Sequence, residues 1–159
     1  MEDAARRGIA IVGPVTGHGA LCEELLRGLP DWFGIEASIL EYARVREELP
    51  AFVAEVDGKA AGLLVVRPTS PAALELHVIA VRRAHHRRGI GRALVERAAV
   101  YARDEGFSLL HTKTLGPEIE DEGYAGTRAF HETVGFMPVE VLPAVWGPEN
   151  PCLIMVRPL

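Results

Sequence analysis

The chain has 159 residues, 48% of them hydrophobic, which is enough for one domain to bury a core of its own. Its formal net charge of -5 and pI near 5.7 argue against a dedicated nucleic-acid-binding protein, which normally carries a basic excess over a whole face. Cys22 and Cys152 are too few for a disulfide framework and lack CxxC spacing, so we expect free thiols and a cytoplasmic location.

No segment of the chain is expected to cross or bind a membrane. The longest apolar runs fall well short of the roughly 20 residues that span a bilayer, and the amphipathic segments are not basic. The first apolar run, Gly8 to Val15, follows two acidic residues and is too short for a signal peptide. Because no repeat or linker interrupts the sequence, a single domain over residues 1–159 is predicted.

Two short helices and a hairpin are predicted in the first half of the chain. Apolar residues recur at helical spacing from His18 to Leu29 and from Ile35 to Glu48. The pair Asp57-Gly58 then separates two strand-like runs, Ala51 to Val56 and Lys59 to Arg67. Because Asp-Gly adopts the positive φ angles of tight two-residue turns, the pair predicts a β-hairpin.

A central strand and a helix follow. The run from Leu74 to Val81 alternates and then becomes wholly apolar, which predicts a strand with polar groups near one end. Its alternation assigns one face to Glu75, His77 and Ile79 and the other to Leu76, Val78 and Ala80. One apolar stripe from Ile90 to Arg103 predicts a helix that ends before Gly106.

The last third of the sequence alternates between strands and a helix. The predicted elements are a strand over Ser108 to Leu115, a helix over Tyr124 to Val134 that Gly135 ends, and a strand pair over Phe136 to Leu142 and Leu153 to Arg157. This order predicts an α/β (α+β) domain in which helices flank a mixed, mostly antiparallel central sheet.

A basic, glycine-containing loop joins the central strand to the helix at Ile90. Two glycines in His86-Arg87-Arg88-Gly89-Ile90-Gly91 let a ligand approach the backbone closely. The first-turn N–H groups of a helix have no intrahelical partners, and the helix dipole favours an anion beside them. A phosphate-bearing ligand is therefore predicted, although a G-x-G pair alone is more often a tight connection. The basic residues of this patch are Arg82, Arg83, His85, His86, Arg87, Arg88 and Arg92.

Two motifs resemble those of the GNAT superfamily of acetyltransferases. Val78-Ile79-Ala80-Val81, a short loop and then His86 to Leu94 are similar to the acetyl-CoA-binding motif, which reads Arg or Gln, two residues, Gly, one residue, Gly or Ala. His86 stands where the family has Arg or Gln. The run from Phe130 to Phe136 resembles the end of the family's second helix, Phe-Tyr-Glu, two residues and Gly-Phe. By order of elements the resemblance extends from Ala51 to Leu159.

The resemblance implies a fold whose sheet is split between the strands at Leu74 and Ser108, where acetyl-CoA enters as co-substrate. It also implies transfer of the acetyl group to an amine by direct attack in a ternary complex. The acceptor would be a small metabolite, an amino-acid-like compound or a peptide amine. The CoA-binding residues that it implies are Ile79, Ala80, Val81, His86, Arg87, Arg88, Gly89, Ile90, Gly91, Arg92 and Tyr124.

Acyl transfer to an amine needs a base, because an alkylamine is protonated at neutral pH. Glu75 matches the position of a catalytic glutamate in some family members, so the resemblance implies that Glu75 is the base. His77 is predicted on the same face of the strand. The alternative is that both are satisfied polar residues at a strand end.

The resemblance also implies a general acid for the leaving thiolate, usually a tyrosine at the position of His131. A partly protonated His131 would serve, and so would Tyr124, which lies seven residues earlier on the same predicted helix face. The alternative is that His131 packs at the surface and water protonates the thiolate. No zinc-ligand spacing occurs, so no metal is expected.

Other interpretations stay open. The histidine in place of tyrosine suggests a catalytically idle CoA-binding sensor or interaction module, whereas nucleic-acid binding through the basic patch is not expected. An acidic loop would steer a cationic amine or simply be solvated, and it consists of Glu118, Glu120, Asp121 and Glu122. The strand pair near the C-terminus and the aromatic residues would support a homodimer.

Overall fold

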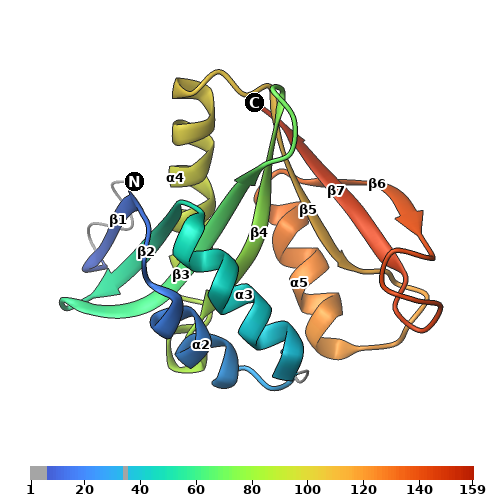
Figure 1. The fold of residues 1–159 in the computed structure, drawn as a ribbon, viewed down its shortest axis with the longest axis horizontal. Helices are drawn as coiled ribbons and strands as arrows, with labels where there is room; N and C mark the ends of the chain where they lie inside the picture. The colour runs from blue at the N-terminus through green and yellow to red at the C-terminus, as the bar shows by residue number, and fades with distance from the viewer. Residues whose placement is uncertain (1–6, 34–35) are drawn as a thin grey trace. The chain divides into compact units, whose positions relative to one another are not determined.

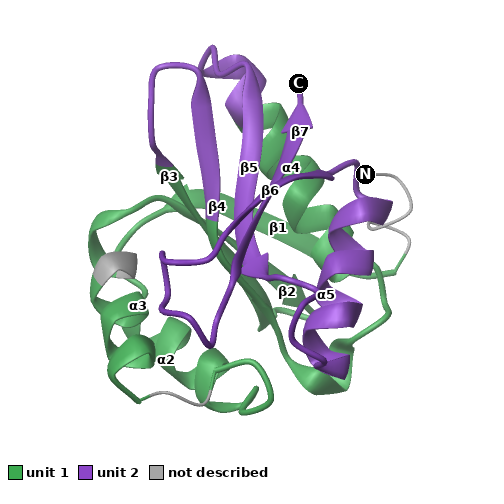
Figure 2. Cartoon of the chain, turned by 90° about the vertical axis from the view of Figure 1, so that its right-hand side faces the viewer, with its two compact units in different colours: residues 1–67, 77–101 green, residues 68–76, 102–159 purple. Residues whose placement is uncertain are grey.

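The computed structural model describes residues 7–33 and 36–159, apart from the side chains of residues 45 and 46 (Figure 1). The chain forms two compact units, Met1–Arg67 with His77–Tyr101 and Pro68–Leu76 with Ala102–Leu159 (Figure 2). The chain passes between the units within strand β4 and within helix α4. The single domain predicted over residues 1–159 stays a prediction.

Seven strands form one sheet in the order β1-β2-β3-β4-β5-β7-β6. Strands β4 and β5 are parallel, whereas β1 with β2, β2 with β3, β5 with β7 and β6 with β7 are antiparallel. This confirms the predicted mixed, mostly antiparallel sheet. The strands are β1 (Ile9–Val15), β2 (Ala51–Val56), β3 (Lys59–Pro68), β4 (Ala73–Val81), β5 (Leu109–Leu115), β6 (Met137–Leu142) and β7 (Cys152–Pro158).

The α-helices follow the predicted segments closely, whereas the short 3-10 helix was not predicted. They are α2 (Gly19–Arg27), α3 (Glu36–Glu48), the short 3-10 helix η1 (Arg83–His85), α4 (Ile90–Asp104) and α5 (Glu122–Thr133). The first residue of the second predicted helix, Ile35, lies outside the described residues. Within the described part of the chain, no helix is long and apolar enough to cross a membrane.

The β2–β3 hairpin in the first unit forms as predicted. Asp57 and Gly58 have φ angles of 51° and 77°, as a tight turn of this type requires. Strand β1, by contrast, was not predicted. It pairs with β2 from Ile9↔Val56 to Val15↔Ala51, but Gly13-Pro14 breaks its pattern at an irregularity between Val12 and Val15.

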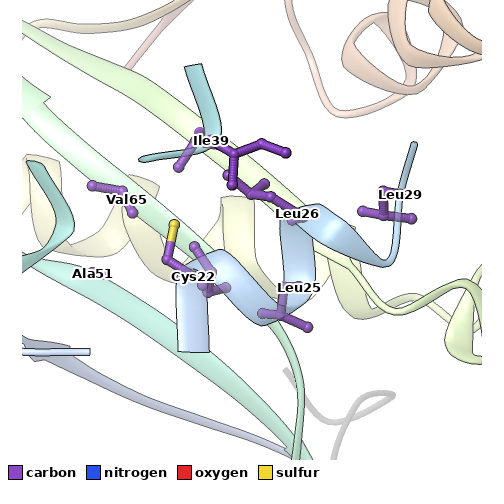
Figure 3. Close-up of a cluster of buried hydrophobic side chains, with 10 residues drawn as sticks. Cys22, Leu25, Leu26, Leu29, Ile39, Ala51 and Val65 are labelled. Atoms are coloured by element: carbon purple, nitrogen blue, oxygen red, sulfur yellow. The ribbon is translucent and has the colours of Figure 1, made fainter. Parts of the chain in front are cut away.

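A hydrophobic cluster fills the space between α2, α3 and the strands of the first unit (Figure 3). Helix α2 contributes at helical spacing, and Ala51, Leu63 and Val65 contribute from β2 and β3. The cluster comprises Cys22, Leu25, Leu26, Leu29, Ile39, Ala51, Leu63, Val65, Val78 and Ala80. The other face of the hairpin packs against α4, where the rings of Phe52 and Tyr101 lie 5.6 Å apart between centroids.

Strand β5 lies between β4 and β7 in the second unit, and β6 forms the sheet edge. The Asp121 side chain caps α5 by accepting a 3.0 Å hydrogen bond from the Tyr124 amide, and Gly135 follows the helix with a φ of 94°. Met137 and Val139 on β6 are 52% and 61% exposed. This exposed apolar edge is consistent with the predicted homodimer, which stays a prediction.

Candidate functional site

The loop between β4 and α4 has the backbone geometry of an anion-binding site. Arg87 and Gly89 adopt positive φ angles of 60° and 84°, which turn the chain sharply before α4 begins at Ile90. A positive φ is unusual for a bulky side chain such as arginine and often marks functional loops. The Ala93 amide donates to the Gly89 carbonyl at 3.0 Å, which marks the first hydrogen-bonded turn of α4. The N–H groups at the start of a helix point along its axis and are suited to an anion.

His86 shapes this loop from within. Its Nε2 atom lies 2.7 Å from the Val81 carbonyl oxygen, and its amide donates to the Arg83 carbonyl at 3.2 Å. The ring of Trp32 meets the imidazole edge-on with centroids 5.9 Å apart. The Nε2 atom and the backbone amide of His86 thus both contact carbonyl groups of the chain just before it. These contacts explain how a histidine fits at this position, where the family motif has arginine or glutamine.

The basic patch divides into paired and ligand-accessible arginines. The Arg82 guanidinium lies 2.8 Å from the Glu24 carboxylate, and Arg83 lies 2.7 Å from Asp31. These two pairs neutralise the start of the patch. Arg87 and Arg88, at the tip of the loop, line a cavity of about 400 Å³. Arg7 lines the same cavity and was missed by the sequence analysis, because only the pairing of β1 with β2 brings it there.

Three of the predicted CoA-binding residues, Ile79, Ala80 and Val81, form the end of β4 that leads into the loop. Ala80 is buried, whereas Ile79 and Val81 are half-buried. Strand β3 passes close at Gly62, where a Cβ atom would lie 2.9 Å from the Ala80 carbonyl oxygen and 3.4 Å from Ile90. A glycine here therefore allows β3, β4 and the start of α4 to approach one another.

In the second unit, the buried Glu75 carboxylate forms an ion pair with a partly exposed lysine. It is 2% exposed, and its Oε2 atom lies 2.6 Å from the Lys113 ammonium. The pairing Glu75↔His111 between parallel strands places Lys113 two residues further along β5, on the same face as His111. His111 Nε2 in turn lies 2.7 Å from the Thr69 hydroxyl. Lys113 supplies the counter-charge that a buried carboxylate needs.

Neither Lys113 nor His111 was found by the sequence analysis, since nothing local marks a strand partner so far along the chain. His77 lies on β4 two residues after Glu75, with its ring edge-on to Tyr42 at 5.4 Å between centroids.

Burial raises the pKa of the Cys152 thiol, and the nearby Lys113 ammonium partly counteracts this rise. A neutral, buried thiol is a poor nucleophile.

His131 was expected either to be partly protonated or to pack at the surface, and the structure differs from both expectations. It is 2% exposed, so the alternative that it packs at the surface is wrong. The rings of Phe130 and Phe136 each lie 5.4 Å from the imidazole centroid, and Nδ1 is buried without a hydrogen-bond partner among the described residues. Burial lowers the pKa of His131 to about 4. The expected partial protonation near neutral pH is therefore corrected: the imidazole is neutral.

Tyr124 lies in the first turn of the same helix and is half-exposed. Of the two acid candidates it is the one whose side chain reaches solvent, and a phenol carries its proton at neutral pH. One member of the acidic loop has a structural task, because Asp121 caps α5. Among the described residues, no group of three or more His, Cys, Asp or Glu side chains is arranged to hold a metal ion.

The geometry agrees with comparisons to known proteins. The sequence profile of the acetyltransferase (GNAT) family matches residues 19–136. No curated protein sequence matches the chain. A GNAT-family acetyltransferase structure from Desulfovibrio desulfuricans superimposes with a TM-score of 0.75 at 23% identity, over 94% of this chain and 98% of that one.

Two further structures share the fold. A GNAT-family acetyltransferase from Elizabethkingia anophelis with acetyl-CoA bound has a TM-score of 0.71 at 18% identity, over 96% of this chain and 99% of that one. The ribosomal-protein-S18-alanine N-acetyltransferase from Escherichia coli has a TM-score of 0.72 at 21% identity, over 94% and 93% of the two chains.

Proposed function

Because the chain belongs to the acetyltransferase (GNAT) family, we propose that it transfers an acetyl group from acetyl-CoA to a primary amine. The observation that carries the proposal is the loop before α4. Its left-handed residues Arg87 and Gly89, the first-turn amides of α4 and the neighbouring guanidiniums suit the pyrophosphate of CoA. When bound, acetyl-CoA supplies an activated thioester. The relative from Elizabethkingia anophelis, which holds acetyl-CoA, supports this choice of co-substrate.

Residues on and around β4 divide the work of binding. Gly89, Ile90 and Gly91 offer backbone amides to the pyrophosphate, and Arg92 adds positive charge one residue further along α4. The residues Ile79 to Val81 lie immediately before the loop and offer backbone groups to the pantetheine arm. His86 holds the loop closed between these two parts through its contact with Val81.

Glu75 is the proposed base. An incoming ammonium group must lose a proton before its nitrogen can attack the thioester carbon, and a carboxylate accepts that proton directly or through water. Lys113 keeps the buried carboxylate paired and oriented at 2.6 Å. As the new C–N bond forms, the C–S bond breaks and the thiolate needs a proton. Tyr124 is the proposed donor, because His131 is neutral and enclosed by aromatic rings.

The acceptor is proposed to be a small-molecule or peptide amine. The Escherichia coli relative, by its name, acetylates an alanine of ribosomal protein S18, which supports a peptide amine as one class to test. The acidic loop at Glu118 and Glu120, both exposed, would favour a cationic acceptor. The alternative function is a CoA-binding module without turnover, which the buried, neutral His131 favours.

The experiment is thiol release from acetyl-CoA over a panel of metabolite, amino-acid and peptide amines, together with the thermal shift produced by CoA. We expect an amine to drive release, Glu75→Gln to slow it without loss of CoA stabilisation, and Gly89→Glu to abolish that stabilisation. Stabilisation by CoA with no reactive amine would favour the idle module. Absence of any CoA effect on the wild type would overturn the proposal.

A further inference from the structure

Lysine is rare in this chain, and one of the two lysines lies beside the proposed base. Of the 17 lysine and arginine residues, only Lys59 and Lys113 are lysines. The Nζ atom of Lys113 lies 2.6 Å from Oε2 of Glu75, and the lysine side chain is 30% exposed. Arginine is the cation best suited to a lasting ion pair, because its planar fork binds a carboxylate bidentately and keeps its charge. A lysine at this position adds a property that arginine lacks, since its amine can lose a proton and act as a nucleophile.

Strand pairing on both sides of β5 holds this amine beside the carboxylate. The parallel pairing Glu75↔His111 places Lys113 two residues further along β5, on the face that His111 shares with Glu75. The antiparallel pairing Lys113↔Ile154 fixes the same backbone position from β7. Only the flexible four-carbon stem of the lysine is left to move Nζ. The amine is therefore fixed at its base and adjustable at its tip.

We propose that Lys113 is an internal acceptor, which the protein acetylates on Nζ with acetyl-CoA when no other amine is present. The inference rests on the proposed function, in which Glu75 takes the proton from the acceptor amine. A primary amine held 2.6 Å from that carboxylate already has the position that an acceptor needs relative to its base. Because it is part of the chain, its encounter with the base costs no further translational entropy.

The transfer balances with the groups that the proposed function supplies. The Lys113 ammonium gives one proton to Glu75, and the Nζ lone pair then attacks the thioester carbon. The C–N bond forms, the C–S bond breaks, and Nζ loses its second proton as the amide forms. Of these two protons, one ends on the thiol of CoA and the other passes to solvent. The acetylated side chain is neutral, so Glu75 loses its counter-charge.

A free acceptor and Lys113 compete for one base. An external amine reaches Glu75 only by displacing the Lys113 ammonium, so the two reactions exclude each other at any moment. Any amine that drives thiol release is therefore expected to protect Lys113 from acetylation. In the absence of an acceptor, the chain should accumulate one acetyl group at Lys113.

Peptide mapping by mass spectrometry, after incubation of the whole protein with acetyl-CoA and no amine, tests the proposal. Lys59 is a matched control in the same chain, because it is exposed at the start of β3 and uncatalysed acetylation favours exposed amines. We expect the modification at Lys113 and not at Lys59. At saturating acetyl-CoA the fraction modified per unit time should not change when the protein is diluted, because acceptor and base belong to one molecule.

Three variants sharpen the test. Lys113→Arg keeps a cation beside Glu75 and should remove the modification completely. Glu75→Gln should slow acetylation of Lys113 by roughly 100-fold, as expected for the loss of a general base. Lys59→Arg should leave the rate at Lys113 unchanged. The thermal shift produced by CoA checks that each variant is folded and binds the co-substrate.

Four outcomes would overturn the inference while the proposed function stands. They are a Lys113 that stays unmodified although CoA stabilises the protein, acetylation of Lys59 as fast as that of Lys113, a rate at Lys113 that falls on dilution or is unaffected by Glu75→Gln, and a reactive amine that fails to protect Lys113. If CoA does not stabilise the wild type and neither a lysine nor a free amine is acetylated, the proposed function fails together with the inference.

Discussion

Protonation of one buried histidine is expected to make this protein less stable in acid. His131 is 2% exposed, and burial lowers its pKa to about 4 from an ordinary value of 6.5. The unfolded chain therefore binds a proton at this residue before the folded chain does. Where the unfolded state binds more protons, stability rises with pH. The free energy of unfolding should thus fall as the pH drops from about 6.5 and level off below about 4.

The magnitude follows from the two pKa values. One pKa unit corresponds to about 1.4 kcal/mol, and most of the interval between the two values is crossed between pH 7 and pH 4.5. The expected loss over this range is about 2 kcal/mol, a large fraction of the roughly 5 to 15 kcal/mol that stabilises a typical domain. The phenylalanine neighbours at 130 and 136 offer no polar partner that would offset the charge.

Urea unfolding of the wild type and of His131→Phe at several pH values between 7 and 4.5 measures this effect. Phenylalanine keeps the ring between its aromatic neighbours and removes the titrating group and the unpartnered Nδ1 atom. Carboxylates such as Glu36, whose pKa is lowered by its hydrogen bond to Arg27, titrate in both proteins and cancel. The stability difference should grow by about 2 kcal/mol on acidification. A difference that stays constant with pH would refute the reasoning.

Three further predictions concern the ion pair, a close strand contact and a thiol. Replacing both Glu75 and Lys113 by methionine is expected to keep the free energy of unfolding within about 2 kcal/mol of the wild type while abolishing thiol release. Gly62→Ala is expected to cost about 1 to 3 kcal/mol in urea unfolding, because the new Cβ atom would lie 2.9 Å from the Ala80 carbonyl oxygen; no measurable cost would mean that β3 shifts freely. Because burial raises the pKa of Cys152, a chromogenic disulfide reagent should label it slowly in native protein and rapidly in urea; rapid native labelling would contradict this.

The parts of the fold that local chemistry determines could be predicted from the sequence. Asp57-Gly58 fixes the hairpin turn, because few other pairs adopt two successive positive φ angles easily. The apolar stripe of α4 and the left-handed Gly106 after it set that helix and its end. The loop at Gly89 was likewise predictable, since its glycine and the following helix are adjacent in sequence.

The parts that depend on long-range pairing could not be predicted. Arg7 reaches the loop only because β1 adds to the edge of β2, and Gly13-Pro14 conceals that strand from any periodicity argument. Lys113 meets Glu75 through a parallel pairing of strands separated by a helix. The burial of His131 depends on Phe136, which follows the helix and turns back onto it: its amide donates to the His131 carbonyl at 2.9 Å.

The Glu75–Lys113 pair is better explained by chemistry than by stability. Taking a carboxylate out of water costs several kcal/mol, and a paired ammonium roughly offsets that cost, so two apolar side chains would hold the sheet about as well. An ion pair with one buried and one partly exposed partner is therefore a poor stabilising device, even at a contact of 2.6 Å. For the proposed base, the pair would keep a charged oxygen at a fixed position near the start of β4. A base needs that charge and that position, whereas a sensor of CoA would need neither, which is why the apolar double variant separates the two functions.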